Sequence, residues 1–394
     1  MRAYGTGTYD SGRYGLGSSL ARVREATLWF LDVFGDATLL SLSTSDKRLH
    51  SWTGTVTSPA ALVAGAPESD AFVITPEMFV LMLGASDNVR RVAWASQATY
   101  TDWTPSAINT AGGFNLPTKG RLLSGVKLIR ETGIFTDDDF WCAVYDGSPD
   151  VIYRFDQRGT QCGIVAPNAF AGFGNDVIWM GRESFYLYQG EVRQLPCDVH
   201  DLVFANINRA QVRKVWAKTV AEFGEVWFHY PSLTSAECDR YVCYNYWEKH
   251  WSAGSIRRSA GIDAGVLQRA VILSPEGYVY EHEVGTERDG EDNPFVESGP
   301  VKIGDGDQVL DVLGVVADEK TLGDAAATLY ARYEPMSDES TEGPFVAADA
   351  NQQGIIESRF AARVVRLRLT QSEDGSKNWR VGIPALMVTP AGFR

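Results

Sequence analysis

The sequence predicts an all-β protein, a β-propeller followed by a C-terminal β-sandwich. Short runs rich in Val, Ile, Phe, Tyr and Trp are separated by turns that draw on 38 Gly and 16 Pro, the pattern of strands joined by tight turns. An apolar strand, a polar turn and a second strand of alternating aromatic and polar residues recur about every 40 to 55 residues, the period of a four-stranded propeller blade.

The recurring hairpin has clear and looser copies. The clear copies are ATLLSLSTSDKRLHSWTG from Ala37, DVIWMGRESFYLYQG from Asp176 and RAVILSPEGYVYEHEVG from Arg269. The looser copies are MFVLMLGASDNVRRVAWAS from 78, TGIFTDDDFWCAVYDGS from 132 and EVWFHYPSLTSAECDRYVCYNYWEKHW from 225. One twisted sheet cannot bury both apolar faces alone, whereas a closed ring of sheets can. A β-sandwich or a string of hairpins is the alternative architecture.

Changes in composition and in strand pattern divide the chain into three parts. Residues 1–26 are rich in Gly and Tyr and predict an arm that orders against a neighbour, residues 27–298 the propeller and residues 299–394 the sandwich. The sandwich strands are expected near 308–316, 326–333 and 362–370. In the last of these, Val365, Leu367 and Leu369 alternate with arginines, so that one face is apolar and the other cationic.

One helix is expected within the propeller. Asp198 can cap it, and Val199, Leu202, Val203 and Ile207 then share one face.

Charge and composition exclude several classes of protein. The 36 Lys and Arg against 50 Asp and Glu give a net charge of −14, which disfavours a protein that clamps nucleic acid through its phosphates. No apolar run is long enough for a membrane span, and the N-terminus lacks a secretory signal pattern, so we expect a protein made in a cytosol without a membrane anchor. The five cysteines lack a CxxC pair and are expected to be free, mostly buried thiols.

No motif predicts catalysis, a cofactor or a metal. The Gly15 to Gly17 pair lacks the third glycine of a dinucleotide loop, and neither a phosphate-binding GxxxxGK[ST] nor HExxH occurs. Residues Thr44 to Trp52 partly match the Asp box of sialidases, but no convincing second copy occurs. The acidic clusters lack the complete pattern of a calcium-binding loop. His282, between two glutamates, fits a strand surface better than a metal site. The residues alone therefore single out no catalytic site.

The C-terminal arginines are the first candidate functional residues. Arg363, Arg366 and Arg368 lie along one expected strand, where they could pair with carboxylates of an acidic partner or a neighbouring subunit. They are therefore interface candidates.

Several long strings resemble the tail-tube proteins of short-tailed bacteriophages, a family also called nozzle, tail hub or packaged-DNA stabilisation proteins. The strings are ASQATYTDWTPSAINTAGGF from 95, GRESFYLYQGEVRQLPCDVHDLVFANIN from 181, FGEVWFHYPS from 223, DRYVCYNYWEKHWSAG from 239, GYVYEHEVGTERDG from 277 and NWRVGIPALMVTPAGFR from 378.

The resemblance implies a non-enzymatic virion component. It implies a homohexameric ring in the tail, below the portal and adaptor proteins and above tail fibres or a tip protein, through which double-stranded DNA passes without sequence recognition. The subunit would be made in the host bacterial cytoplasm. An acidic chain can repel DNA from such a lumen, and Asp137, Asp138 and Asp139 are candidates for its lining or rim. A glycan-binding or glycan-cleaving tail protein on the same fold is the alternative.

Overall fold

The computed structural model describes residues 26–148, 151–265, 268–282, 284, 293–302, 308–316, 325–334, 336–346, 354–371 and 381–393. The expected N-terminal arm therefore lies outside the described residues, apart from Ala26. The chain divides into two compact units, Met1–His282 and Glu283–Arg394. The boundary expected after residue 298 is placed too late, because the strand at residues 295–297 pairs within the second unit.

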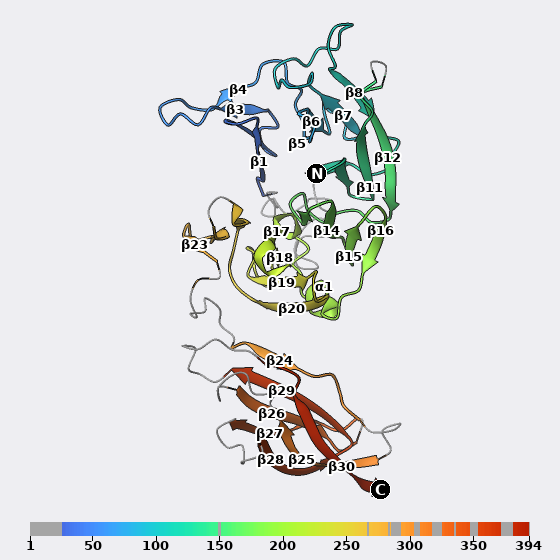
Figure 1. Ribbon diagram of the computed structural model, residues 1–394, viewed down its shortest axis with the longest axis vertical. Coiled ribbons are helices and arrows are strands. Elements are labelled where there is room, and N and C mark those ends of the chain that lie inside the picture. Colours follow the sequence, from blue (N-terminus) through green and yellow to red (C-terminus); the bar gives the residue numbers. More distant parts are fainter. Residues whose placement is uncertain are drawn as a thin grey trace, which may run out of the picture. The chain divides into compact units, whose positions relative to one another are not determined.

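Six antiparallel sheets follow one another along the described part of the first unit (Figure 1). The first three sheets contain β1 (Trp29–Phe34), β2 (Thr38–Ser43), β3 (His50–Trp52) and β4 (Ala61–Leu62); β5 (Ala71–Ile74), β6 (Val80–Leu83), β7 (Arg91–Trp94) and β8 (Gly112–Asn115); and β9 (Leu122–Lys127), β10 (Thr132–Thr136), β11 (Asp139–Tyr145) and β12 (Tyr153–Thr160). The next three contain β13 (Phe170–Phe173), β14 (Asp176–Met180), β15 (Phe185–Tyr188) and β16 (Val192–Leu195); β17 (Trp216–Val220), β18 (Glu225–Tyr230), β19 (Arg240–Asn245) and β20 (His250–Ser255); and β21 (Ala260–Ile262), β22 (Val271–Leu273) and β23 (Val279–Glu281).

The order of the strands is that of a β-propeller, as the sequence predicts. Each sheet is a meander in which consecutive strands pair. The first strands of neighbouring sheets lie against one another, β1 with β5, β5 with β9, β13 with β17 and β17 with β21. A Cβ on Gly172 of β13 would lie 3.3 Å from the Val126 side chain of β9, so these two first strands also approach closely. The first strands thus form the hub of the unit.

The recurring hairpin of the sequence forms the second and third strands of each sheet. The six copies fold into β2–β3, β6–β7, β10–β11, β14–β15, β18–β19 and β22–β23. Every residue of β6 is buried, as are the last four of β14. A sheet inside a propeller packs against a neighbour on both faces. Its central strands are therefore continuous runs of apolar residues rather than alternations of apolar and polar residues.

Two apolar clusters form most of the core of the first unit. One joins the first three sheets around Leu40, Phe79 and Ile134. The other joins the third, fourth and fifth sheets around Phe140, Trp179 and Phe228. The third sheet contributes to both clusters, which shows that its two faces are covered by different neighbours.

The expected helix is shorter than predicted. α1 spans His200–Phe204, and its N-cap is Val199 rather than Asp198, with no side chain of the described residues capping it. Val203 and Ile207 are buried but Leu202 is 53% exposed, so the expected apolar face is incomplete. Two 3₁₀ turns, η1 (Val212–Lys214) and η2 (Ala221–Phe223), flank β17.

The second unit is a β-sandwich, as predicted. One sheet has the order β24-β29-β26-β27 and the other β28-β25-β30. Their bounds are β24 (Phe295–Glu297), β25 (Gln308–Val316), β26 (Ala325–Arg332), β27 (Ser340–Val346), β28 (Ile355–Ala362), β29 (Val364–Gln371) and β30 (Ala385–Phe393). Val365, Leu367 and Leu369 of β29 face the shared core, so the alternation in the sequence predicts the buried face correctly.

Gly163 lies where the chain crosses the turn between β10 and β11. A Cβ at this position would meet the backbone C and O atoms of Asp137 at 2.2 Å, so Gly163→Ala forces a backbone shift. We expect a loss of about 1–3 kcal/mol in the free energy of unfolding. The readout is the thermal midpoint from tryptophan fluorescence, because every Trp except Trp379 belongs to the first unit. Gly172→Ala in the same unit is the control, since the nearest atom to its Cβ would be in the Val126 side chain at 3.3 Å rather than in the backbone, and an equal effect of both would contradict the packing argument.

Candidate functional site

An arginine-lined surface lies at one end of the propeller hub. Its lining comes from segments that lead into successive first strands, with Asp70 immediately before β5, Arg121 immediately before β9 and Arg213 in η1, just before β17. Two adjoining hollows of about 310 and 370 Å³ share Arg121, Leu123, Pro167 and Arg213. Because consecutive sheets repeat one path, residues far apart in the sequence meet at this end.

Positive charge dominates these hollows. Their charged lining consists of Lys47, Arg121, Arg182, Arg209 and Arg213 against Asp70 and Asp137. We refer to this set as the hub cluster. An excess of cations on a chain of net charge −14 concentrates positive potential at one place.

The two carboxylates of the hub cluster are already engaged. Asp70 lies 2.9 Å from Lys47 Nζ and 3.8 Å from Arg121 Nη2. Asp137 accepts a 2.8 Å hydrogen bond from the Arg121 backbone N–H and lies 3.9 Å from Arg182 Nη2. The Nε of Arg121 is buried without a hydrogen-bond partner in the described part of the chain. The arrangement suits the binding of an anionic group, such as a phosphate or carboxylate.

No motif in the sequence points to the hub cluster. Arg121 is one of 36 Lys and Arg residues, and nothing in its immediate neighbourhood distinguishes it. The signal that is available is positional, namely a charged residue directly before the first strand of a sheet, as at Asp70 and Arg121. Recognising it requires the strand boundaries.

The three consecutive aspartates have different environments. Asp138 is exposed and Asp137 belongs to the hub cluster. Asp139 is 3% exposed, and its carboxylate accepts hydrogen bonds from Thr118, Thr136 and Gln157. The expectation of a rim residue is therefore wrong for Asp139, which holds the turn together. A lumen or rim role for Asp137 and Asp138 stays a prediction.

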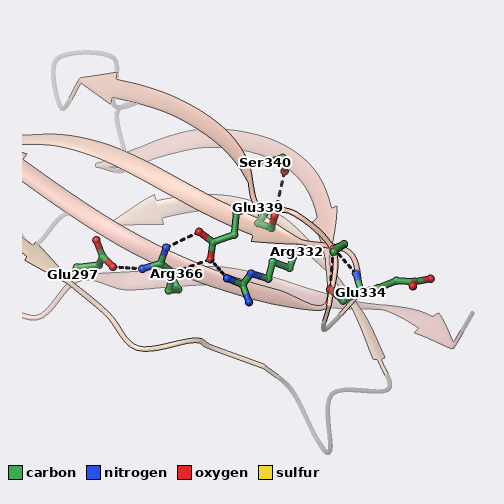
Figure 2. A network of polar contacts seen from close by, with 8 residues as sticks. Glu297, Arg332, Glu334, Glu339, Ser340 and Arg366 are labelled. Carbon is green, nitrogen blue, oxygen red and sulfur yellow. Dashed lines mark hydrogen bonds and ion pairs between the residues drawn. The ribbon is translucent and has the colours of Figure 1, made fainter. Parts of the chain in front are cut away.

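The C-terminal arginines have partners within their own chain (Figure 2). Arg366 donates to Glu339 at 3.1 Å through Nε and at 2.7 Å through Nη2, and it also pairs with Glu297. Arg332 lies 3.0 Å from the same Glu339. Hydrogen bonding from Arg366 lowers the pKa of Glu339. The network ties β24, β26 and β29 together on the face opposite the core.

Arg368 and Arg363 lie on or next to the same strand. The Arg368 guanidinium lies 3.8 Å from the centre of the Phe295 ring and 3.9 Å from Glu297. Arg363 is partly buried, and its backbone N–H donates to the Arg332 carbonyl at 2.9 Å. The sequence suggests intermolecular partners for these arginines, whereas the structure gives Arg366 and Arg368 intramolecular ones. Their role in an interface stays a prediction.

A buried group of basic and aromatic residues joins the fifth and sixth sheets. His229 is fully buried, its ring stacks on Trp216 at 4.2 Å, and neither ring nitrogen has a hydrogen-bond partner in the described part of the chain. Lys218 Nζ donates to Nδ1 of His282 at 2.8 Å. Burial, followed by the charge of Lys218, lowers the pKa of His282 to about 4. His282 is therefore a half-buried hydrogen-bond acceptor rather than a strand-surface residue.

The cysteines are reduced and mostly shielded from solvent. All five cysteines are free thiols and all but Cys197 are buried. Burial raises the pKa of Cys142, Cys162 and Cys238 to about 12, which keeps them as thiols at neutral pH. Within the described ranges, no group of three or more His, Cys, Asp or Glu is placed to hold a metal ion, and no helix is long and apolar enough to cross a membrane.

The Arg366 network predicts a pH-dependent contribution to the stability of the second unit. Since the folded-state pKa of Glu339 lies below its ordinary 4.5, the network stabilises above that pH and loses its effect as the pH falls through the lowered pKa. Arg366→Gln should therefore speed amide hydrogen exchange in β26 and β29 at pH 7, and the difference from the wild type should shrink below pH 4.5. Arg359→Gln, at an exposed position of β28, is the control. A difference that persists unchanged at about pH 3 would contradict the ionic explanation.

His229 predicts acid sensitivity of the first unit. Burial, together with the charges of Lys218, His282 and Arg258, lowers the pKa of His229 well below 6.5. The neutral ring is thus fully accommodated above pH 6.5, and stability falls as the pH drops toward the lowered pKa, by up to about 1.4 kcal/mol per pH unit. His229→Phe should flatten the dependence of the tryptophan thermal midpoint on pH between about 6.5 and 5. The exposed His250→Phe should leave the wild-type slope unchanged, and a parallel slope for His229→Phe would rule out this explanation.

Comparisons with known proteins give structural likeness only. Neither a protein-family model nor a curated protein matches the sequence. Among solved structures, the chain is similar to BBS1N in complex with ARL6DN, with a TM-score of 0.39 and 12% identity over 90% of this chain and 95% of that one. It is also similar to a protein of Bacteroides fragilis described as exported, with a TM-score of 0.38 and 10% identity over 65% and 81% of the two chains. At these TM-scores the likenesses carry no argument, so the propeller assignment rests on sheet order and strand contacts.

Proposed function

We propose that the chain is a structural subunit of the tail tube of a short-tailed bacteriophage, assembled as a homohexameric ring in the virion. In this proposal the ring lies below the portal and adaptor and above fibres or a tip protein. It retains the packaged genome and conducts double-stranded DNA on ejection, without catalysis.

The observation that carries the proposal is the set of long strings that resemble this family. Those strings occupy β15 and β16, β18 to β20, β23 and β30, and so fall in both units. They include strand interiors as well as connecting loops. A resemblance that spans the core strands of a propeller and the last strand of a separate sandwich is more specific than a shared loop motif.

The charge distribution supports a route for DNA between subunits rather than through one propeller. The hub cluster carries five cations against two carboxylates, and cations at this density would hold phosphates instead of letting them pass. The chain as a whole has a net charge of −14. A lumen between subunits can therefore be lined by carboxylates such as that of the exposed Asp138 and repel the DNA backbone.

The test is the mass of the purified chain in solution, alone and mixed with the adjacent portal, adaptor and tip components, followed by negative-stain imaging. A sixfold ring, free or formed only on the adaptor complex, is expected. A monomer that ignores these components would contradict the tube, and glycan-binding and glycan-hydrolysis screens would then test the alternative.

Interface variants in this assay need a matched control. Charge reversal at Arg366 breaks the ion pairs with Glu297 and Glu339, so lost assembly could reflect a damaged sandwich. Arg359→Glu changes an exposed position of the same unit without touching that network. Hydrogen exchange in β29 must therefore accompany each mass measurement.

A further inference from the structure

Three arginines of the hub cluster line one hollow although they come from different parts of the propeller. Arg121 directly precedes β9, Arg182 lies in the turn between β14 and β15, and Arg209 lies between α1 and η1, on the way to β17. In an antiparallel meander, the start of the first strand and the turn between the second and third strands lie at the same end of the sheet. The topology therefore gathers these guanidinium groups around the hollow of about 310 Å³.

The contacts of these arginines leave N–H donors available. Arg182 Nη2 lies 3.9 Å from the carboxylate of Asp137, and Arg121 Nη2 lies 3.8 Å from that of Asp70, so both ion pairs are longer than a hydrogen bond. The Nε of Arg121 is buried without a hydrogen-bond partner among the described residues. Arg209 donates from Nη1 to the carbonyl of Arg182 at 2.7 Å. Each guanidinium has five N–H donors, so these contacts occupy only a few of them.

The charge of the hollow calls for an anion with more than one negative charge. Its charged lining consists of four arginines and one aspartate, which leaves a surplus of three positive charges. A carboxylate carries one negative charge, whereas a phosphate monoester carries about two at neutral pH. Apolar neighbours lower the local dielectric constant and strengthen the attraction for such an anion. The rest of the lining is apolar, namely Leu123, Ile164, Val165, Pro167 and Val212.

The arrangement of the donors also favours a phosphate. One guanidinium fork can engage both oxygens of a carboxylate, because the two groups are planar. The oxygens of a phosphate point in tetrahedral directions, so that they can accept hydrogen bonds from several guanidinium groups at once. Arginines that reach one hollow from the third, fourth and fifth sheets match the second case.

We propose that this hollow binds a phosphate group, to which Arg121, Arg182 and Arg209 donate hydrogen bonds. A free diphosphate and the terminal phosphate of a nucleic-acid strand offer the same group, and the experiments below distinguish these two sources. The bound phosphate links the third, fourth and fifth sheets at this end of the propeller. The inference concerns a single subunit and does not depend on the proposed tail function.

Isothermal titration calorimetry of the full chain with inorganic diphosphate tests the site. We expect saturable binding of one diphosphate per chain. Arg182→Gln and Arg209→Gln should each weaken it by about tenfold or more, since each removes charged hydrogen-bond donors. Arg193→Gln is the control, because Arg193 is exposed on β16 of the same sheet as Arg182 and does not line the hollow. Absence of binding to the wild type, or an equal loss in the control, would overturn the proposal.

Further titrations identify the source of the phosphate. The probes are inorganic diphosphate, a DNA tetranucleotide with a 5′-phosphate and the same tetranucleotide without it. Tighter binding of diphosphate indicates a free ligand, whereas tighter binding of the phosphorylated tetranucleotide, lost without its 5′-phosphate, indicates a strand end. Citrate is the carboxylate control. Citrate that binds more tightly than both phosphate probes would overturn the assignment to phosphate.

A second measurement uses the wild-type chain alone, in case a variant does not fold. Phenylglyoxal modifies accessible arginines, and mass spectrometry of the digested chain gives the rate at each one. Arg182, Arg209 and Arg193 are all exposed. Saturating diphosphate should slow the modification of Arg182 and Arg209 by about tenfold or more and leave that of Arg193 unchanged. Equal rates with and without diphosphate at Arg182 and Arg209 would overturn the proposal.

Discussion

The first unit depends on the burial of both faces of each sheet by its neighbours. An isolated four-stranded sheet with apolar residues on both faces would expose both faces to water, at a cost of about 25 cal/mol per Å² of apolar surface. The third sheet shows the constraint directly, because Ile134 and Phe140 of its central hairpin belong to different clusters. Interior sheets satisfy the constraint on both sides.

The same constraint explains what the sequence reveals. Central strands buried on both faces appear as apolar runs, so the six hairpins and the propeller class can be predicted without coordinates. The sandwich strands are visible through alternation, as in Val365, Leu367 and Leu369. By contrast, β24 has three residues and no periodicity of its own, and only its pairing with β29 assigns it to the second unit.

Contacts between residues that are far apart in the sequence cannot be predicted from the sequence alone. Arg366 is 69 residues from Glu297 and 27 from Glu339, and nothing local to the arginine distinguishes these two from the other acids of the chain. Asp139 presents the same difficulty, because its burial depends on Thr118 and Gln157, which reach it from neighbouring segments. The hub cluster requires the order of the sheets as well, since its members precede different first strands.

The Arg366 network has a mechanical consequence. The first described strand of the second unit is β24, a strand of three residues that is hydrogen-bonded to β29 alone among the described strands. A force that pulls on the N-terminal side of β24 is therefore resisted by that one pairing and by the side chains of β24. The ion pair from Glu297 to Arg366, and from there to Glu339 and Arg332, spreads that load over β26 and β29. A cationic strand face thus acts as an anchor that resists the peeling of β24 from the sandwich.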